Sequence, residues 1–244
     1  MKNTKSLYHG HRFPAAVISH AVRWCFRFQL SLRDIEELLF ERGVTVSYET
    51  VQRRCDKFGA CFVHRVKATC RRSGTTWHLD EVFVMLRGEP YLLWCAVDQH
   101  GAELDILLQE RRDKGAAKRF FKRMLAACAE VPRKIVTDQL RSHPAVKAEI
   151  PELAHVRHVF VKASARLINR AENTHQPTRE RERRMRGFRV PERTQAFLST
   201  FGSIRQHFAL KRHLLCASLY RRQLGERFTS RHHFTELTQD PSAF

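Results

Sequence analysis

The chain has 244 residues, 43% of them hydrophobic, and a formal net charge of +19. This length and hydrophobic content can build one medium-sized domain and a smaller one, which excludes a chain that is disordered throughout. The charge favours a polyanionic partner, with nucleic acid first and an anionic membrane surface second. No apolar stretch approaches the roughly 20 residues of a membrane span, and no apolar signal segment follows the first residues, so a membrane protein is not expected.

Helices are predicted from residue 13 to about residue 60, where apolar side chains recur at helical spacing. Pro14 suits the first turn of the first helix. Ser31 and Asp34 have the spacing of a capping box at the start of the second helix, and Gly43 fits its end.

The third helix is expected to follow Ser47 and to run from Tyr48 to about Lys57, with Val51 facing inward. Two short helices joined by a glycine-containing turn, the second one basic, are typical of a helix-turn-helix. An ordinary helical bundle would show the same pattern, and the net charge favours DNA binding. The candidate DNA-contacting residues here are Tyr48, Gln52, Arg53, Arg54 and Lys57.

The periodicity changes near residue 70. Strands are predicted at 77–86, 90–97 and 102–109, with a turn signal at 98–101 between the second and the third. Because the connections are short, these strands are expected to form an antiparallel meander.

Helices and strands alternate after the meander. We expect a helix at 116–129, a buried strand at 134–137, a helix around 144–153, a short strand at 156–161 and a polar helix at 169–186. This order predicts an α/β domain whose sheet has mixed strand directions.

Seven cysteines are scattered along the chain without any Cys-x-x-Cys pair, which is typical of a reducing compartment. Cys55, Cys61, His64 and Cys70 include zinc-ligand residue types. Their spacing matches no common zinc pattern, and we favour the interpretation that the cysteines act as small hydrophobic residues.

Two aspartates stand on predicted strands. Asp80 lies within an apolar strand, on the face of His78 and Val82, where a carboxylate is unusual. Asp138 follows a strand at its carboxyl end, where open α/β sheets place ligands. Each could instead be a structural aspartate, in a hydrogen-bonded site or a turn.

The third acidic residue, Glu172, opens the polar helix. The spacing of Asn169 and Glu172 also fits a capping role. Glu172, His175 or Gln176, and Arg179 fall along one helical face, where a metal-bound carboxylate would be followed by a cation for a neighbouring phosphate. Pro177 is expected to interrupt or kink this helix.

Carboxylates that converge repel one another unless cations balance them. Mg²⁺ or Mn²⁺ would do so, and two such ions about 4 Å apart can activate water or a 3′-hydroxyl for in-line displacement at phosphorus. No glycine-rich phosphate loop and no G-x-S-x-G motif occurs, and tyrosine is sparse, so covalent recombinase chemistry is not indicated.

These motifs resemble the bacterial insertion-sequence transposases with an Asp-Asp-Glu triad, specifically insertion-sequence family six. The resemblance covers roughly residues 10–215. The matching segments are 77–81, 96–98, 112–121, 137–138 and 169–179, with 31–39 and 41–44 resembling the family's helix-turn-helix.

The resemblance implies a ribonuclease-H-like mixed sheet flanked by helices and preceded by an all-α helix-turn-helix region. It implies that Asp80, Asp138 and Glu172 are catalytic metal ligands for two Mg²⁺ ions, for which Mn²⁺ can substitute. Arg179 matches the basic residue that the family places seven positions after the glutamate and is a candidate DNA contact. The implied reaction is cleavage at the ends of the element and attack of the 3′-hydroxyl on target DNA.

From these observations we predict a helix-turn-helix region at 1–65, a catalytic domain at 70–190 and a C-terminal helical region at 191–244. The partners would be the terminal inverted repeats, target DNA and at least one further copy of the chain, in the bacterial cytoplasm at the nucleoid and not at a membrane. Two alternatives stay open: a DNA-binding regulator with a catalytically inactive transposase-like domain, and a divalent-metal nuclease without strand transfer.

Overall fold

The computed structural model describes residues 7–69, 74–111, 113–128, 130–137, 146–161, 169–210 and 212–235, without the side chains of 68–69, 169–174 and 233–235. The chain divides into two compact units, one formed by residues 1–70 with 200–244 and the other by 71–199. The boundary between residues 199 and 200 falls inside helix α7, Pro191–Phe208. The three predicted region boundaries stay a prediction. None of the described helices is both long and apolar enough to cross a membrane.

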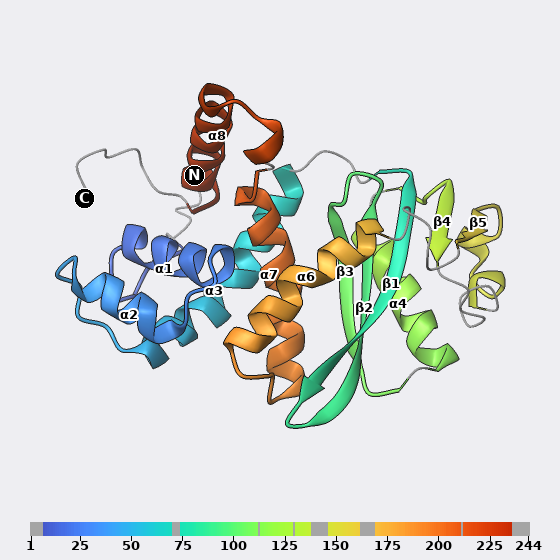
Figure 1. Ribbon diagram of the computed structural model, residues 1–244, viewed down its shortest axis with the longest axis horizontal. Coiled ribbons are helices and arrows are strands. Elements are labelled where there is room, and N and C mark those ends of the chain that lie inside the picture. Colours follow the sequence, from blue (N-terminus) through green and yellow to red (C-terminus); the bar gives the residue numbers. More distant parts are fainter. Residues whose placement is uncertain are drawn as a thin grey trace, which may run out of the picture. The chain divides into compact units, whose positions relative to one another are not determined.

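The first unit is helical, with α1 at Ala15–Arg27, α2 at Leu32–Phe40, α3 at Tyr48–Thr69 and α8 at Ala217–Thr235 (Figure 1). The capping box of α2 is confirmed: Ser31 Oγ accepts a hydrogen bond from the Asp34 N–H at 3.1 Å, and Asp34 Oδ2 accepts one from the Ser31 N–H at 2.7 Å. Gly43 follows α2 with φ +73°, a left-handed conformation that favours glycine.

Helix α3 extends well beyond the predicted end near Lys57, so that prediction is wrong. Tertiary packing accounts for the extension, because apolar side chains remain buried at helical spacing as far as Val66. Gly59 lies inside the helix and costs helix propensity. A Cβ atom there would lie 2.8 Å from Thr200 Cγ2 and 3.2 Å from the ring of Phe26, so glycine permits this close approach.

The second unit contains a five-stranded sheet with the order β3-β2-β1-β4-β5. The strands are β1 at Thr76–Leu86, β2 at Glu89–Asp98, β3 at Glu103–Gln109, β4 at Lys134–Thr137 and β5 at Arg157–Phe160. β1, β2 and β3 form the predicted antiparallel meander, while β4 pairs parallel to both β1 and β5. This strand order and mixed direction confirm the expected ribonuclease-H-like sheet.

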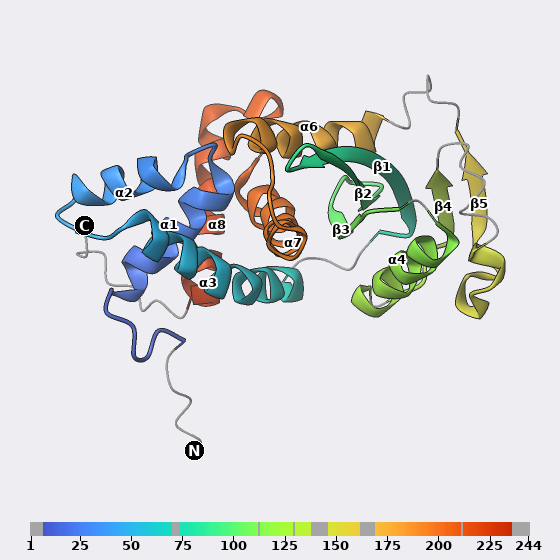
Figure 2. The same ribbon diagram turned by 90° about the horizontal axis from the view of Figure 1, so that it is seen from below.

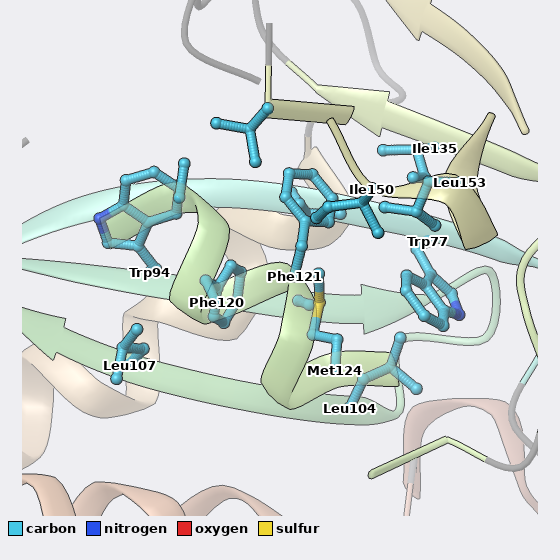
Figure 3. Packing of buried hydrophobic residues seen from close by; sticks show 14 of the residues in the cluster. Trp77, Trp94, Leu104, Leu107, Phe120, Phe121, Met124, Ile135, Ile150 and Leu153 are labelled. Carbon is cyan, nitrogen blue, oxygen red and sulfur yellow. The ribbon is translucent and has the colours of Figure 1, made fainter. Parts of the chain in front are cut away.

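Helices cover both faces of this sheet. Figure 2 shows α4, Lys114–Ala127, on one side and α6, Asn169–Arg184, on the other. Asp113 caps α4, since its Oδ1 accepts a hydrogen bond from the Ala116 N–H at 2.6 Å. Under α4, aromatic and aliphatic side chains form a buried cluster (Figure 3) that includes Trp77, Trp94, Phe120, Phe121 and Met124.

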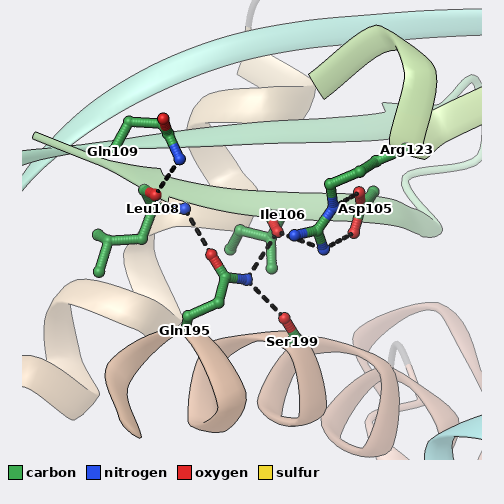
Figure 4. Close-up of polar contacts among 7 residues, drawn as sticks. All are labelled: Asp105, Ile106, Leu108, Gln109, Arg123, Gln195 and Ser199. Atoms are coloured by element: carbon green, nitrogen blue, oxygen red, sulfur yellow. Dashed lines mark hydrogen bonds and ion pairs between the residues drawn. The ribbon is translucent and has the colours of Figure 1, made fainter. Parts of the chain in front are cut away.

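The outer strand β3 is held by side chains from two helices (Figure 4). Gln195 of α7 accepts a hydrogen bond from the Leu108 N–H at 2.7 Å and donates one to the Ile106 carbonyl at 3.0 Å. Arg123 of α4 makes a two-point contact with Asp105 at 3.0 and 3.1 Å. These contacts cover a sheet edge that would otherwise expose backbone groups.

Candidate active site

Asp80 lies in β1 on the sheet face that α6 covers. Its Oδ2 is 2.9 Å from His175 Nε2, and its Oδ1 accepts a hydrogen bond from the Glu81 N–H at 2.9 Å. Both side chains are largely buried, with 14% of Asp80 and 6% of His175 exposed. A buried carboxylate needs hydrogen-bond partners. The partner of Asp80, His175, lies 95 positions further along the sequence.

Helix α6 brings its first turns to Asp80. The sequence left His175 and Gln176 as alternatives on the helical face of Glu172, and the structure selects His175, because Gln176 is exposed and hydrogen-bonded to Glu180. Positions three apart share a helical face, so position 172 is on the face of α6 that carries His175. The backbone of Glu172 belongs to α6, and its side chain lies outside the described residues.

Asp138 lies outside the described residues. The residue before it, Thr137, is buried at the end of β4, and its Oγ1 is 2.9 Å from His158 Nε2. β4 runs parallel to β1, with Val136 beside His78. The described structure therefore places the strand that leads into Asp138 directly beside the strand that carries Asp80.

The sequence predicts an interruption or a kink of α6 at Pro177, and the interruption does not occur. The helix runs through Pro177 to Arg184. Pro177, Thr178 and Arg181 are buried, so side-chain packing stabilises the helix despite the missing backbone donor. Arg179 is exposed on this unbroken helix, which leaves its side chain accessible to a nucleic acid.

Two polar residues of β2 have other roles. Cys95 pairs with Asp80 across β1 and β2, and burial raises the pKa of its thiol, with further contributions from Glu103, Asp80 and Asp105. The thiol is therefore protonated at neutral pH. Asp98 accepts hydrogen bonds from the backbone N–H groups of Gly74, His100 and Ala102, which makes it a structural turn residue.

The predicted DNA-contacting residues lie in the first turns of α3, in the helical unit. Arg53 and Lys57 are exposed, while Tyr48, Gln52 and Arg54 are half-buried. The guanidinium of Arg33 lies over the Tyr48 ring, 5.4 Å from its centroid, which adds another cation next to the start of α3.

His11 lies beside this basic surface. Its Nε2 is 3.0 Å from Lys57 Nζ. Burial lowers the pKa of His11, and the positive charges of Arg54 and Lys57 lower it further. The neutral imidazole then accepts a hydrogen bond from the ammonium group of Lys57. The exposed cations Arg53 and Lys57 give this part of α3 a positive charge, which is the property expected of a DNA-binding helix.

The zinc pattern considered for the cysteines gains no support from the part of the chain that the structure describes. Cys55 is buried, Cys61 is half-buried, and Cys70 lies outside the described residues. No group of three or more histidine, cysteine, aspartate or glutamate side chains able to hold a metal ion occurs among the described residues, a set that does not include the side chains of Asp138 and Glu172.

Comparisons with known proteins fit this geometry. A family model described as a DDE domain matches residues 74–211. The transposase for insertion sequence-like element IS431mec of Staphylococcus aureus is 30% identical over 183 residues, which cover 75% of this chain and 81% of the relative. The transposase for insertion sequence element IS257 in transposon Tn4003, also from Staphylococcus aureus, matches with the same identity and coverage.

Two solved structures are also similar. The HTLV-2 integrase catalytic core domain in complex with magnesium, in its dimeric form, is 15% identical, with a TM-score of 0.31 over 44% of this chain and 72% of that one. The simian T-cell lymphotropic virus intasome in complex with PP2A regulatory subunit B56 gamma is 12% identical, with a TM-score of 0.39 over 63% of this chain and 57% of that one.

Proposed function

The chain belongs to the DDE transposases of insertion-sequence family six, and from this premise we propose that Asp80, Asp138 and Glu172 form its metal-binding active site. In this proposal the protein binds the terminal inverted repeats of its element, cleaves DNA at the ends and joins them to target DNA. Membership of the family identifies the protein as a DNA transposase. The identity of the catalytic residues, the metal ion and the individual reaction steps belong to the proposal.

The observation that carries the proposal is the contact between Asp80 and His175, which fixes β1 against the turn of α6 that follows Glu172. The register of β1 and β4 supplies the second support. Thr76, Trp77 and His78 each pair with the β4 residue at one constant sequence spacing. β4 therefore runs toward the part of β1 that carries Asp80. Three separate segments thus lead toward one place on the sheet.

The donor set fits a hard divalent cation. Three carboxylates offer only oxygen ligands, which Mg²⁺ and Mn²⁺ prefer, and the neighbouring thiol of Cys95 stays protonated because burial raises its pKa. When bound by Asp80, Asp138 and Glu172, a pair of such ions would activate the attacking oxygen and stabilise the leaving one in an in-line displacement.

The protein's own side chains position this chemistry. A carboxylate oxygen only accepts hydrogen bonds, so Nε2 of His175 carries the hydrogen donated to Asp80 Oδ2. His175 thereby fixes the orientation of the Asp80 carboxylate and leaves its other oxygen, Oδ1, on the Glu81 N–H. Arg179, exposed on the same helix, would contact a phosphate next to the reacting one.

DNA recognition is assigned to the helical unit. Tyr48, Gln52, Arg53, Arg54 and Lys57 would contact the terminal repeats, with the exposed cations on phosphates and the remaining side chains toward base edges. A transposase that joins two ends of one element needs at least two copies of the chain, so we include a homodimer or larger assembly in the proposal.

Charge-neutral substitutions test the triad. Asp80→Asn, Asp138→Asn and Glu172→Gln remove a hard-cation ligand while nearly preserving shape. Each should lower strand transfer by at least about 1,000-fold, measured with labelled duplexes drawn from the DNA that flanks the gene, and each should retain DNA binding. The matched control is Glu180→Gln, a half-buried carboxylate on the same helix, which should join DNA at close to the wild-type rate.

Glu172→Gln also separates catalysis from helix capping, because glutamine serves equally well at that capping position. Normal joining by this variant would remove Glu172 from the active site. The same assay distinguishes the alternatives: wild-type protein that binds the ends without cutting would be a regulator, and protein that cuts without joining would be a nuclease.

A further inference from the structure

Two turns of the second unit, residues 71–199, carry an arginine in a left-handed conformation. Arg87 has φ 51° and Arg186 has φ 56°, and they are the only non-glycine residues with positive φ in the described part of the chain. Each is followed by a glycine that also has positive φ, Gly88 at 89° and Gly187 at 83°. Arginine in this conformation costs about 1–2 kcal/mol.

Other residues would fit both turns better. Arg87 and Gly88 form the two-residue turn between β1 and β2, in which positive φ at both positions favours Asn-Gly. Arg186 follows the end of α6: its N–H donates to the Arg183 carbonyl and the Gly187 N–H to the Glu182 carbonyl. That is the Schellman arrangement, whose left-handed position is usually glycine. Local stability therefore does not explain either arginine.

The two turns meet. The Arg87 N–H donates to the Phe188 carbonyl at 3.0 Å, and the Phe188 N–H donates to the Met85 carbonyl at 3.3 Å. Glu182 accepts a hydrogen bond from the Met85 N–H at 2.7 Å. These bonds fix the β1–β2 turn against the end of α6, so that residues about 100 positions apart in sequence form one surface.

This junction lines a hollow of about 530 Å³ that contains three arginines, Arg87, Arg186 and Arg189, and no acidic residue. All three arginines are exposed. Among the described residues, no carboxylate forms an ion pair with any of them. Three unneutralised guanidinium groups on a fixed backbone are suited to a ligand with more than one phosphate, since each can make two parallel hydrogen bonds to phosphate oxygens.

We infer that this three-arginine hollow binds the phosphate backbone of the DNA on which the transposase acts, as a second anchor away from the active site. The inference rests on the proposed function, because the DNA must extend from the triad to the hollow. Arg179 and Arg183 are exposed four positions apart on α6, which puts them on one helical face, and Arg186 follows two residues after the helix ends at Arg184.

The geometry of α6 sets the distance between the two sites. From His175 to the end of α6 at Arg184 the chain advances nine residues, or about 14 Å at the helical rise of 1.5 Å per residue, and Arg186 lies two residues further on. Successive phosphates of one DNA strand advance about 3.4 Å along the duplex axis. For DNA that runs parallel to α6, the anchored phosphates would lie roughly five nucleotides from the phosphate that reacts.

The test uses substitutions that improve the turns while removing the charges. Arg87→Asn and Arg186→Gly install the residues that each turn favours, and Arg189→Gln removes the third cation. The full-length triple variant should keep or slightly raise its urea midpoint. Its affinity for a fluorescein-labelled duplex of about 30 base pairs should fall on the order of 100-fold, and its salt slope should fall by about two to three.

The control is a triple variant of three other exposed arginines of the same unit, Arg133→Gln, Arg157→Gln and Arg193→Gln, which loses equal charge. Equal losses of DNA affinity in the two triple variants would show that only the total charge matters, and would overturn the inference. Unchanged affinity of the variant with substitutions at Arg87, Arg186 and Arg189 would also overturn it. In those cases wild-type joining still supports the proposed function, whereas wild-type protein that neither binds nor joins DNA would overturn both.

A neutral methylphosphonate scanned along the end duplex locates the contact. Substitution about five nucleotides from the joined end should weaken wild-type binding and leave the first triple variant unaffected. Equal sensitivity of both proteins at every position would place the DNA elsewhere.

Discussion

The two faces of the sheet are covered in different ways. Under α4 the buried side chains form an apolar cluster centred on Trp94, Phe120 and Phe121. The opposite face has a smaller apolar cluster around Val84 and Leu93, and it also buries polar groups that are bonded to one another across helices and strands. These include the Asp80–His175 contact and the hydrogen bonds of Gln195 to β3.

The difference separates stability from chemistry. Apolar burial is non-directional and contributes free energy wherever area is removed from water. A carboxylate site needs the opposite, namely a few polar groups held in place by specific partners. The sheet assigns these tasks to opposite faces, so substitutions on the two faces should change different measurements.

The largest stability effect is expected on the α4 face. Phe120→Ala removes a fully buried ring from the apolar cluster and should lower the free energy of unfolding by about 3–5 kcal/mol. Urea denaturation measures this loss, and joining per folded molecule should stay within about two-fold of wild type. A loss below about 1 kcal/mol would show that this face is not the main source of stability.

The next effect belongs to the opposite face and concerns function. His175→Ala should raise the Mg²⁺ concentration for half-maximal joining by about 10- to 100-fold, because Asp80 loses the partner that orients it. His175→Gln keeps a donor and should recover part of the loss. A purely structural role for His175 would lower stability while leaving the Mg²⁺ dependence of the folded enzyme unchanged.

A smaller loss is expected where α7 covers the sheet edge. Gln195→Ala removes two hydrogen bonds to the backbone of β3 and should lower the free energy of unfolding by about 1–2 kcal/mol. Ser199→Ala, which removes only the 2.7 Å contact to Gln195, is the matched control and should cost less. Equal losses would mean that the bonds to β3 contribute nothing of their own.

The smallest effect is expected for Phe83, which lies on the sheet face that α4 covers but beyond the buried cluster. Phe83 shares the strand face of Trp77 and Leu79, yet 67% of it is exposed. Phe83→Ser should therefore change the free energy of unfolding by no more than about 0.5 kcal/mol, again by urea denaturation. A loss comparable to that of Phe120→Ala would mean that Phe83 is covered in solution, for instance by a second copy of the chain.

The sequence by itself determined the local elements and the class of the protein. Apolar runs and turn residues located β1, β2 and β3, and the capping box at Ser31 located α2, because these features depend on neighbours within a few residues. The same strand pattern singled out Asp80 as a carboxylate on an apolar strand. The family resemblance then identified a transposase with a ribonuclease-H-like fold, which the strand order and the relatives confirm.

Only the tertiary structure decided what depends on distant partners. It extended α3 to Thr69 and kept α6 continuous through Pro177, since packing outweighs local propensity at both places. It selected His175 over Gln176 as the partner of Asp80, and it joined the turns of Arg87 and Arg186 into one hollow. Helical spacing shows which positions share a face, but the residue that a face meets is set by the packing of the whole sheet.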